Sequence, residues 1–151
     1  MDIRSGGKYP AGALSNFSPH PFTLDDVEIS SMEGFLQSLK FKSPEMQVEV
    51  CKLVGRAAKM KGANKKWQTK QVLYWRGEEI KRDSDEYQEL LDRAYNAMYE
   101  QSQSFRKALA SSVGATLTHS MGKSKKNETV LTTQEFCSRL TILREYGKIN
   151  R

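Results

Sequence analysis

The chain has 151 residues, of which 38% are hydrophobic and 28% charged, the balance of one globular domain that can bury a core of its own. The two cysteines, Cys51 and Cys137, lie far apart and show no metal-ligand spacing. Because a secreted protein of this size more often carries a disulfide framework, two cysteines favour a reducing, cytoplasmic compartment. No stretch resembles the apolar region of a signal peptide or approaches the roughly 20 apolar residues of a membrane span, so we expect no membrane partner.

The formal net charge is +6, and the excess is uneven. Residues 50–77 contain eight basic side chains and no acidic one, and a second cluster of three lysines lies within residues 123–126. Such clusters favour anionic partners, either phosphates or nucleic acid. A basic face that contacts only solvent would give the same pattern.

The first half of the chain alternates loops with short predicted elements. Residues 5–21 carry three prolines and three glycines and predict an ordered loop, and residues 22–30 predict a hairpin. Ser30-x-x-Glu33 has the form of a capping box at the start of a helix that runs to about Phe41. Ser43-Pro44 predicts the start of a second helix to about Val54, and a further turn or two ends at Gly62.

The second half predicts another hairpin over residues 71–80 and then mainly helix. Asp83-x-x-Glu86 has the form of a cap for the longest helix, whose apolar spacing continues in a further turn or second helix past residue 105. Thr132-x-x-Glu135 caps the last helix, and we expect the tail from Gly147 to be frayed. The predicted fold is a single domain, 1–151, mainly α with one or two short β-hairpins.

The helix near residue 33 carries the polar side chains that are the best candidates for catalysis. Its apolar residues fall in one stripe, whereas Glu33, Gln37 and Lys40 fall together beside it. An acid, an amide and an amine on a mostly buried helix need polar partners, which a pocket would supply. Alternatively, Glu33 completes its capping box and Lys40 extends to solvent. The chain has no Ser-His-Asp signature, P-loop, dinucleotide fingerprint or zinc spacing.

These residues belong to a longer set of motifs. The sequence Leu14-Ser-Asn-Phe17 is followed by a Pro-Phe strand and then by Glu33-x-x-x-Gln37-x-x-Lys40-Phe41. Later segments are Gly55-Arg56, Lys66-Trp67, Tyr74-Trp75, Ser84-x-Glu86-Tyr87-Gln88, Leu117-Thr-His119-Ser120-x-Gly122-Lys123 and the stretch from Glu128 to Leu140. In order and spacing, over about residues 14–144, the chain resembles the NADAR family, the YbiA-like N-glycosidases.

The resemblance implies a mainly helical fold that hydrolyses an N-glycosidic bond. Two substrate classes are associated with the family: phosphoribosylamine intermediates of the riboflavin pathway, and guanine carrying ADP-ribose, the lesion made by DNA ADP-ribosyltransferase toxins. Two departures stand out. Gly34 lies where many members have histidine, and the segment His119-Ser-Met-Gly-Lys123 replaces the Tyr-Trp-Gly stretch of the YbiA branch. The second departure weakens transfer of the riboflavin-pathway substrate more than transfer of the reaction type.

The expected activity is therefore hydrolysis of the ribosyl C1–N bond of ADP-ribosylated guanine, in DNA. The alternatives are the same chemistry on a phosphoribosyl metabolite or ADP-ribose-like nucleotide, and a non-catalytic module that binds ADP-ribose or DNA. We expect no metal and no cofactor, and a cytoplasmic location, in the host if a virus encodes the chain. The expected catalytic residues are Glu33, Lys40 and Gln37, and the expected substrate-binding residues are Ser15, Asn16, Phe17, Arg56, Lys66, Trp67, His119, Ser120, Gly122 and Lys123.

Overall fold

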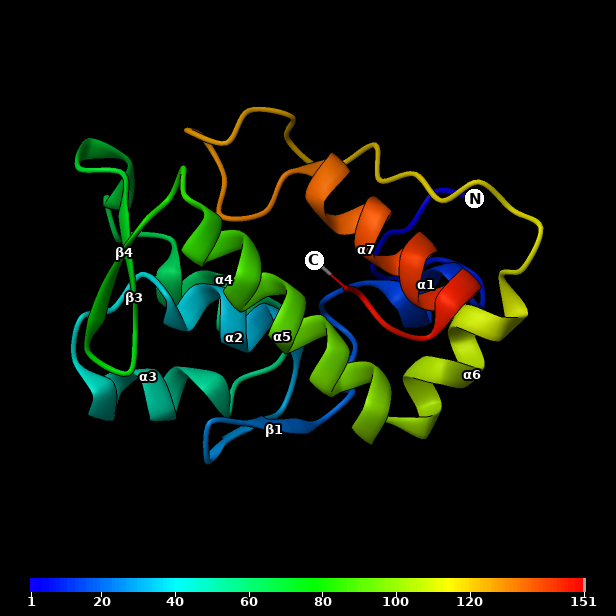
Figure 1. The fold of residues 1–151 in the computed structure, drawn as a ribbon, viewed down its shortest axis with the longest axis horizontal. Helices are drawn as coiled ribbons and strands as arrows, with labels where there is room; N and C mark the ends of the chain where they lie inside the picture. The colour runs from blue at the N-terminus through cyan, green and yellow to red at the C-terminus, as the bar shows by residue number, and fades with distance from the viewer. Residues whose placement is uncertain (151) are drawn as a thin grey trace.

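The computed structural model describes residues 1–150 and is mainly helical, with two small antiparallel sheets, which confirms the predicted fold class (Figure 1). The long helix α5 (Asp85–Gln101) runs through the middle of the molecule, from the β3–β4 hairpin at one end toward α6 at the other. Within the described residues, no helix is long and apolar enough to cross a membrane. The elements in chain order are α1 Ala11–Leu14, β1 Phe22–Leu24, β2 Val27–Ile29, α2 Met32–Ser38, α3 Pro44–Cys51, α4 Gly55–Gly62, the 3₁₀ turn η1 Trp67–Thr69, β3 Val72–Trp75, β4 Glu78–Lys81, α5 Asp85–Gln101, α6 Gln103–Ser111 and α7 Thr133–Tyr146.

Both predicted hairpins are present. Strands β1 and β2 pair from Phe22 opposite Ile29, and β3 and β4 pair from Val72 opposite Lys81. The first turn consists of Asp25 and Asp26 with φ of 49° and 65°, so both residues adopt the left-handed backbone that a tight two-residue hairpin turn requires. The loop over residues 5–21 contains one short helix, α1, which the sequence did not predict.

The helix starts show where capping signals are ambiguous. Thr132 forms the predicted capping box with Glu135, and Ser43 caps α3. The box predicted at Ser30–Glu33 is wrong, because the cap of α2 is the next serine, Ser31, whose Oγ accepts a hydrogen bond from the Gly34 amide at 3.1 Å. The prediction for α5 is wrong by one residue in the same way, since its cap is Ser84 in place of Asp83.

Helix α2 is the centre of one end of the molecule, with α3 and α4 packed against it. Its predicted apolar stripe is buried, from Met32 at 1% exposure to Leu39 at 0%. Gly34 allows the close approach, because a Cβ at this position would lie 2.6 Å from the carbonyl oxygen of Leu53. A larger residue here, such as the histidine common in the NADAR family, would require a different path for the chain after α3. Helix α3 itself ends at Cys51, three residues earlier than predicted.

The predicted fraying of the tail is wrong for the residues that the structure describes. Gly147 ends α7 with φ of 75°, and the chain then turns back so that Ile149 is buried. The backbone amide of Ile149 donates to Asn96 Oδ1 at 2.8 Å, and Asn96 Nδ2 donates to the Ile149 carbonyl at 3.0 Å. Two hydrogen bonds and one apolar side chain therefore hold the tail on α5, and no residue pattern near Gly147 indicates this contact.

A buried ion pair fixes the segment that leads into α7. Arg82 is fully buried and donates two hydrogen bonds to Glu135, at 2.6 and 3.1 Å, and a third to the carbonyl of Thr129 at 2.9 Å. Burial alone would raise the pKa of Glu135, but the hydrogen bonds from Arg82, Thr132 and Gln88 hold that pKa at about 2. Residues 129–132 are thereby fixed in place, and residues 129–131 of this segment border the cavity described next.

Candidate active site

One cavity of about 610 Å³ opens beside α2 and is lined by segments from most of the chain. Its walls come from the N-terminal residues, the loop before β1, α2, α4, the 3₁₀ turn η1, the turn at 119–123 and the segment 128–131. This cavity collects ten of the thirteen residues predicted as a site: Ser15, Asn16, Phe17, Glu33, Gln37, Lys40, Trp67, His119, Gly122 and Lys123.

The other three predicted residues do not line the cavity. Arg56 and Lys66 are exposed on α4 and just before η1. Ser120 is engaged elsewhere, because its Oγ and its amide both donate to the carboxylate of Asp2, at 2.6 and 2.7 Å. A basic cluster in a sequence does not indicate which of its members lie on the helix face that meets the cavity.

Glu33, Gln37 and Lys40 lie together, as their spacing on one helix predicted. Gln37 Nε2 donates to Glu33 Oε2 at 2.7 Å, and Lys40 Nζ lies 3.4 Å from the carbonyl oxygen of Gly62, at the end of α4. Because Ser31 caps the helix, the Glu33 carboxylate is not used by a capping box and is available to the cavity. The alternative interpretation of Glu33 as a capping residue is therefore wrong.

Burial perturbs both charged groups of this set in the direction that favours their neutral forms. It raises the pKa of Glu33, although the hydrogen bond from Gln37 and the charges of Lys40, Lys59 and His119 oppose the rise. Burial also lowers the pKa of Lys40, and the positive charge of Lys59 adds to the decrease while Glu33 opposes it. Perturbed acid and amine side chains in one cavity are typical of catalytic sites.

The amide of Gln37 is only half satisfied. Its Nε2 bonds Glu33, whereas its Oε1 is the one buried side-chain oxygen or nitrogen without a hydrogen-bond partner within residues 1–150. Gly62 lies directly against this oxygen, and a Cβ at that position would overlap it. The acceptor is therefore buried against the end of α4, and Gly62 provides the space in which the amide lies.

The loop at residues 15–17 forms one wall and is tied to the site. The Asn16 carbonyl accepts a hydrogen bond from the Glu33 amide at 3.0 Å, and its Oδ1 accepts one from the hydroxyl of Tyr95 at 2.9 Å. Phe17 is half-buried and presents part of its ring, whereas Trp67 is only 6% exposed and belongs mainly to the core. Of the two aromatic residues, Phe17 offers more surface to a ligand.

Several lining residues were not predicted. Arg4 and Lys59 add two cations, and Glu128 adds a second carboxylate. Lys59 belongs to the basic cluster of residues 50–77, and nothing in the sequence distinguishes it from Arg56 on the same short helix. No sequence signal marks Arg4 either, since its place depends on long-range pairing in which the Ile3 amide donates to the Thr118 carbonyl at 2.8 Å. The remaining unpredicted lining residues are Ser5, Gly6, Leu36, Gln68, Met121, Thr129, Val130, Leu131 and Phe136.

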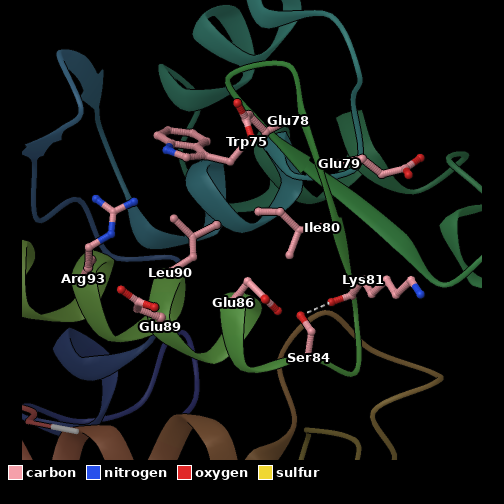
Figure 2. A pocket seen from close by; sticks show the side chains of 10 residues that line it. All are labelled: Trp75, Glu78, Glu79, Ile80, Lys81, Ser84, Glu86, Glu89, Leu90 and Arg93. Atoms are coloured by element: carbon pink, nitrogen blue, oxygen red, sulfur yellow. Dashed lines mark hydrogen bonds between the residues drawn. The ribbon is translucent and has the colours of Figure 1, made fainter.

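A second hollow, of about 720 Å³, lies between β4 and the start of α5 and contains none of the predicted residues (Figure 2). In Figure 2 its glutamates are distributed around the edge on two elements, Glu78 and Glu79 on β4, and Glu86 and Glu89 on α5, and they do not converge on one point. The cavity beside α2 is therefore the candidate active site. Among residues 1–150, no group of three or more metal-ligating side chains is arranged to hold an ion.

Comparisons with known proteins agree with the mainly helical fold described above. The NMR structure of the Escherichia coli protein YbiA superposes with a TM-score of 0.64 at 18% identity, over 96% of this chain and 82% of YbiA, so the fold is YbiA-like. An uncharacterized 17.1 kDa protein from the Gp30–rIII intergenic region of Enterobacteria phage T4 is 37% identical over 147 residues, which are 96% of this chain and 97% of that protein. The family model of bacteriophage protein GP30.3 matches residues 8–145, and the chain therefore belongs to the bacteriophage GP30.3 protein family.

Proposed function

We propose that this protein is an N-glycosidase of the NADAR type that hydrolyses the ribosyl C1–N bond of ADP-ribosylated guanine in DNA. One observation carries the proposal: a half-buried carboxylate, Glu33, and a half-buried amine, Lys40, share one cavity, and each has a perturbed pKa. A protein that only binds ADP-ribose has no need of a carboxylate whose burial costs stability. The YbiA-like fold and the phage relatives are compatible with reversal of a modification that a host toxin places on DNA.

The chemistry follows from charge development at the sugar. As the C1–N bond breaks, positive charge builds on the ribosyl ring, and a fixed carboxylate beside C1 stabilises it. Glu33 supplies that carboxylate, and its raised pKa also suits it to accept the proton of the attacking water. Gln37 acts through its hydrogen bond to Glu33, which holds the carboxylate in position.

Lys40 has two chemically distinct roles open to it. As a cation it lowers the pKa of Glu33 and keeps the carboxylate charged. As a neutral amine, which its lowered pKa favours, it attacks the aldehyde of the opened sugar and forms an imine with loss of one water, and hydrolysis of the imine frees the lysine again. Both roles place its Nζ in the cavity beside Glu33, and a substitution that keeps the charge but removes the primary amine separates them.

The cations around the cavity favour a substrate with phosphates. Arg4, Lys59 and Lys123 line it, and further basic residues lie outside the cavity on α4 and before η1. The cavity residues suit the pyrophosphate of ADP-ribose, and the outer ones suit a nucleic-acid backbone. The YbiA-like fold favours one rival, in which the same chemistry acts on a phosphoribosylamine intermediate and the outer cations contact only solvent.

The direct test is turnover by the purified protein. We expect release of ADP-ribose from an oligonucleotide that carries ADP-ribosylated guanine, and no release of the amine from riboflavin-pathway phosphoribosylamines. Glu33→Gln is the matched control, because it is isosteric and its side-chain oxygen still accepts the Gln37 hydrogen bond. Turnover of the phosphoribosylamine alone would favour the rival, and failure on both substrates would contradict the proposed reaction.

Substrate class is tested separately with Glu33→Ala as a non-cleaving trap. Under the proposal the trap binds the ADP-ribosylated oligonucleotide more tightly than free ADP-ribose. Its affinity for the oligonucleotide falls more steeply with salt, with a slope of roughly −0.7 for each phosphate contact on a single strand. Equal affinities and equal slopes for the two ligands would exclude nucleic acid as the substrate.

A further inference from the structure

The turn at residues 119–123 is held unusually firmly for a segment at the edge of a cavity. The Asp2 carboxylate accepts hydrogen bonds from the amide and hydroxyl of Ser120 and from the hydroxyl of Thr118, at 2.7, 2.6 and 3.2 Å. The hydrogen bonds from Ser120 are the main reason that the pKa of Asp2 is lowered. On the other side the Thr133 hydroxyl donates to the carbonyl of His119 at 3.3 Å. The N-terminal segment and α7 together fix the position of this turn.

The imidazole of His119 is fixed within the turn. Nδ1 lies 2.6 Å from the carbonyl oxygen of Ile3, and because a carbonyl only accepts, Nδ1 carries the hydrogen. The ring packs edge-on against Phe136, with centroids 5.3 Å apart, and a Cβ at Gly122 would lie 2.6 Å from its Cδ2. Nε2 has no hydrogen-bond partner within residues 1–150, and it is the one ring atom free to exchange a proton with a ligand.

His119 and Glu33 border the same cavity from different elements. The charge of the His119 ring is among the influences that lower the pKa of Glu33, so the two groups are within electrostatic range. Cleavage of a ribosyl C1–N bond needs one group that assists water at C1 and another that protonates the departing nitrogen. Lys40, which lies just past the end of α2, contacts the Gly62 carbonyl, whereas His119 borders the cavity from the turn at 119–123 and its Nε2 has no partner within residues 1–150.

We propose that His119 in its imidazolium form, protonated at both ring nitrogens, is the general acid of the reaction, and that the Ile3 carbonyl and the Asp2 carboxylate are positioning groups that present its Nε2–H to the glycosidic nitrogen. This rests on the proposed N-glycosidase function. The C1–N bond breaks with its electron pair going to nitrogen, which takes the proton from Nε2. Water adds to C1 and gives one proton to Glu33, and that proton returns to His119 through solvent. The sum is one water consumed and one amine and one ribosyl hydroxyl formed, with no other reactant.

The test compares two leaving groups. His119→Asn retains an amide donor near the Nδ1 position for the Ile3 carbonyl and removes Nε2. General acid catalysis contributes about 10²- to 10⁴-fold, so we expect a loss of that size on ADP-ribosylated guanine. On the same substrate methylated at guanine N7, the base leaves without needing a proton, and we expect the variant to lose less than about tenfold relative to wild type. Met121→Ala, on the same turn, should change both rates by the same factor.

The outcomes separate this inference from the proposed function. If the wild type cleaves neither substrate, the N-glycosidase proposal is contradicted. If the wild type is active and His119→Asn loses the same factor on both substrates, or loses nothing, then His119 is not the acid although the reaction stands. A measurement that needs no variant is a long-range ¹H–¹⁵N spectrum of the wild type. It should show neutral His119 protonated at Nδ1, and protonation at Nε2 would overturn the assignment.

Discussion

Gly62→Ala should disturb the site through a single methyl group. Gly62 closes α4 without a positive φ, so no backbone strain requires a glycine there. A glycine is required here for steric reasons: an added Cβ overlaps Gln37 Oε1, and Gln37 is only 6% exposed, so its side chain has little room to move. The amide must rotate, and its hydrogen bond to Glu33 is then lost.

The magnitude follows from opposing contributions. Overpacking costs about 1–3 kcal/mol, and a hydrogen bond to a charged group contributes about 1.5–3 kcal/mol, discounted here because Glu33 is partly solvated. Alanine in place of glycine in a helix returns up to about 1 kcal/mol. We expect a net loss of about 1–3 kcal/mol in the free energy of unfolding, or a decrease in Tm of roughly 3–10 °C for a chain of this size.

The assay is urea unfolding of a double-mutant cycle with Gln37→Ala. Once Gln37 is truncated, the methyl group at position 62 no longer overlaps an amide and meets only the retained Cβ of residue 37, at 3.3 Å. Gly62→Ala should then cost little, and the coupling energy should be about 1–3 kcal/mol. Ala57→Gly, at an exposed site on the same helix, calibrates the helix-propensity contribution. The hydrogen bond from Gln37 lowers the pKa of Glu33, so a ¹³C NMR titration of Gly62→Ala should find that pKa higher. Additive unfolding energies, or an unchanged titration of Glu33, would refute the reasoning.

Three further predictions concern charge. Glu33→Gln should abolish turnover and stabilise the fold at pH 8. Burial raises the pKa of Glu33, so the ionised carboxylate lowers the stability of the wild type above that pKa. The melting temperatures of variant and wild type should therefore converge as the pH falls toward about 4. Lys40→Arg keeps the positive charge but removes the primary amine, so under the imine route it should be as inactive as Lys40→Ala. Borohydride should then trap substrate on the wild type only, whereas full activity of Lys40→Arg would leave only the electrostatic role. The double variant Lys65→Glu, Lys66→Glu should weaken binding of the ADP-ribosylated oligonucleotide far more than binding of ADP-ribose, and it should flatten the salt dependence of oligonucleotide binding. The same charge reversal at exposed Lys107 and Lys148 is the control and should do neither. Part of the Lys65 effect will come from the loss of its contact with the Phe41 ring, whose centroid is 4.8 Å from Nζ.

The grouping of the three proposed catalytic residues could be predicted from the sequence because it depends on local geometry. Glu33, Gln37 and Lys40 lie on one helix and its last turn, and a period of 3.6 residues is enough to bring them together. The hairpins were equally accessible, since each depends on two adjacent strands and the turn between them. The errors at the helix starts also have a local cause. Ser30 and Ser31 are neighbours, and only the backbone conformation shows which of them is the cap.

What the sequence did not reveal depends on contacts between distant segments. Arg4 reaches the cavity because residues 1–3 pair with residues 116–118, more than a hundred positions away. His119 was predicted only through the family resemblance, and the orientation of its ring depends on the carbonyl of Ile3 in the same pairing. The charge clusters led to the wrong choice of cavity residue, because Arg56 and Lys59 look alike in sequence although only Lys59 lines the cavity.

The seven residues of α2 are too few for a helix that is stable on its own, so its neighbours must impose the geometry of the site. The Ser31 hydroxyl donates to the Leu53 carbonyl at 2.9 Å, and the Asn16 carbonyl accepts a hydrogen bond from the Glu33 amide in the first turn of the helix. Two glycines, Gly34 and Gly62, let the backbones of the connection after α3 and the end of α4 approach the helix. A carboxylate and an amine that are both unfavourable to bury are thus held in place by a frame built from apolar packing and backbone hydrogen bonds. Neutralising either charge should therefore leave the frame intact, and substitutions in the frame should change activity without touching a reacting group.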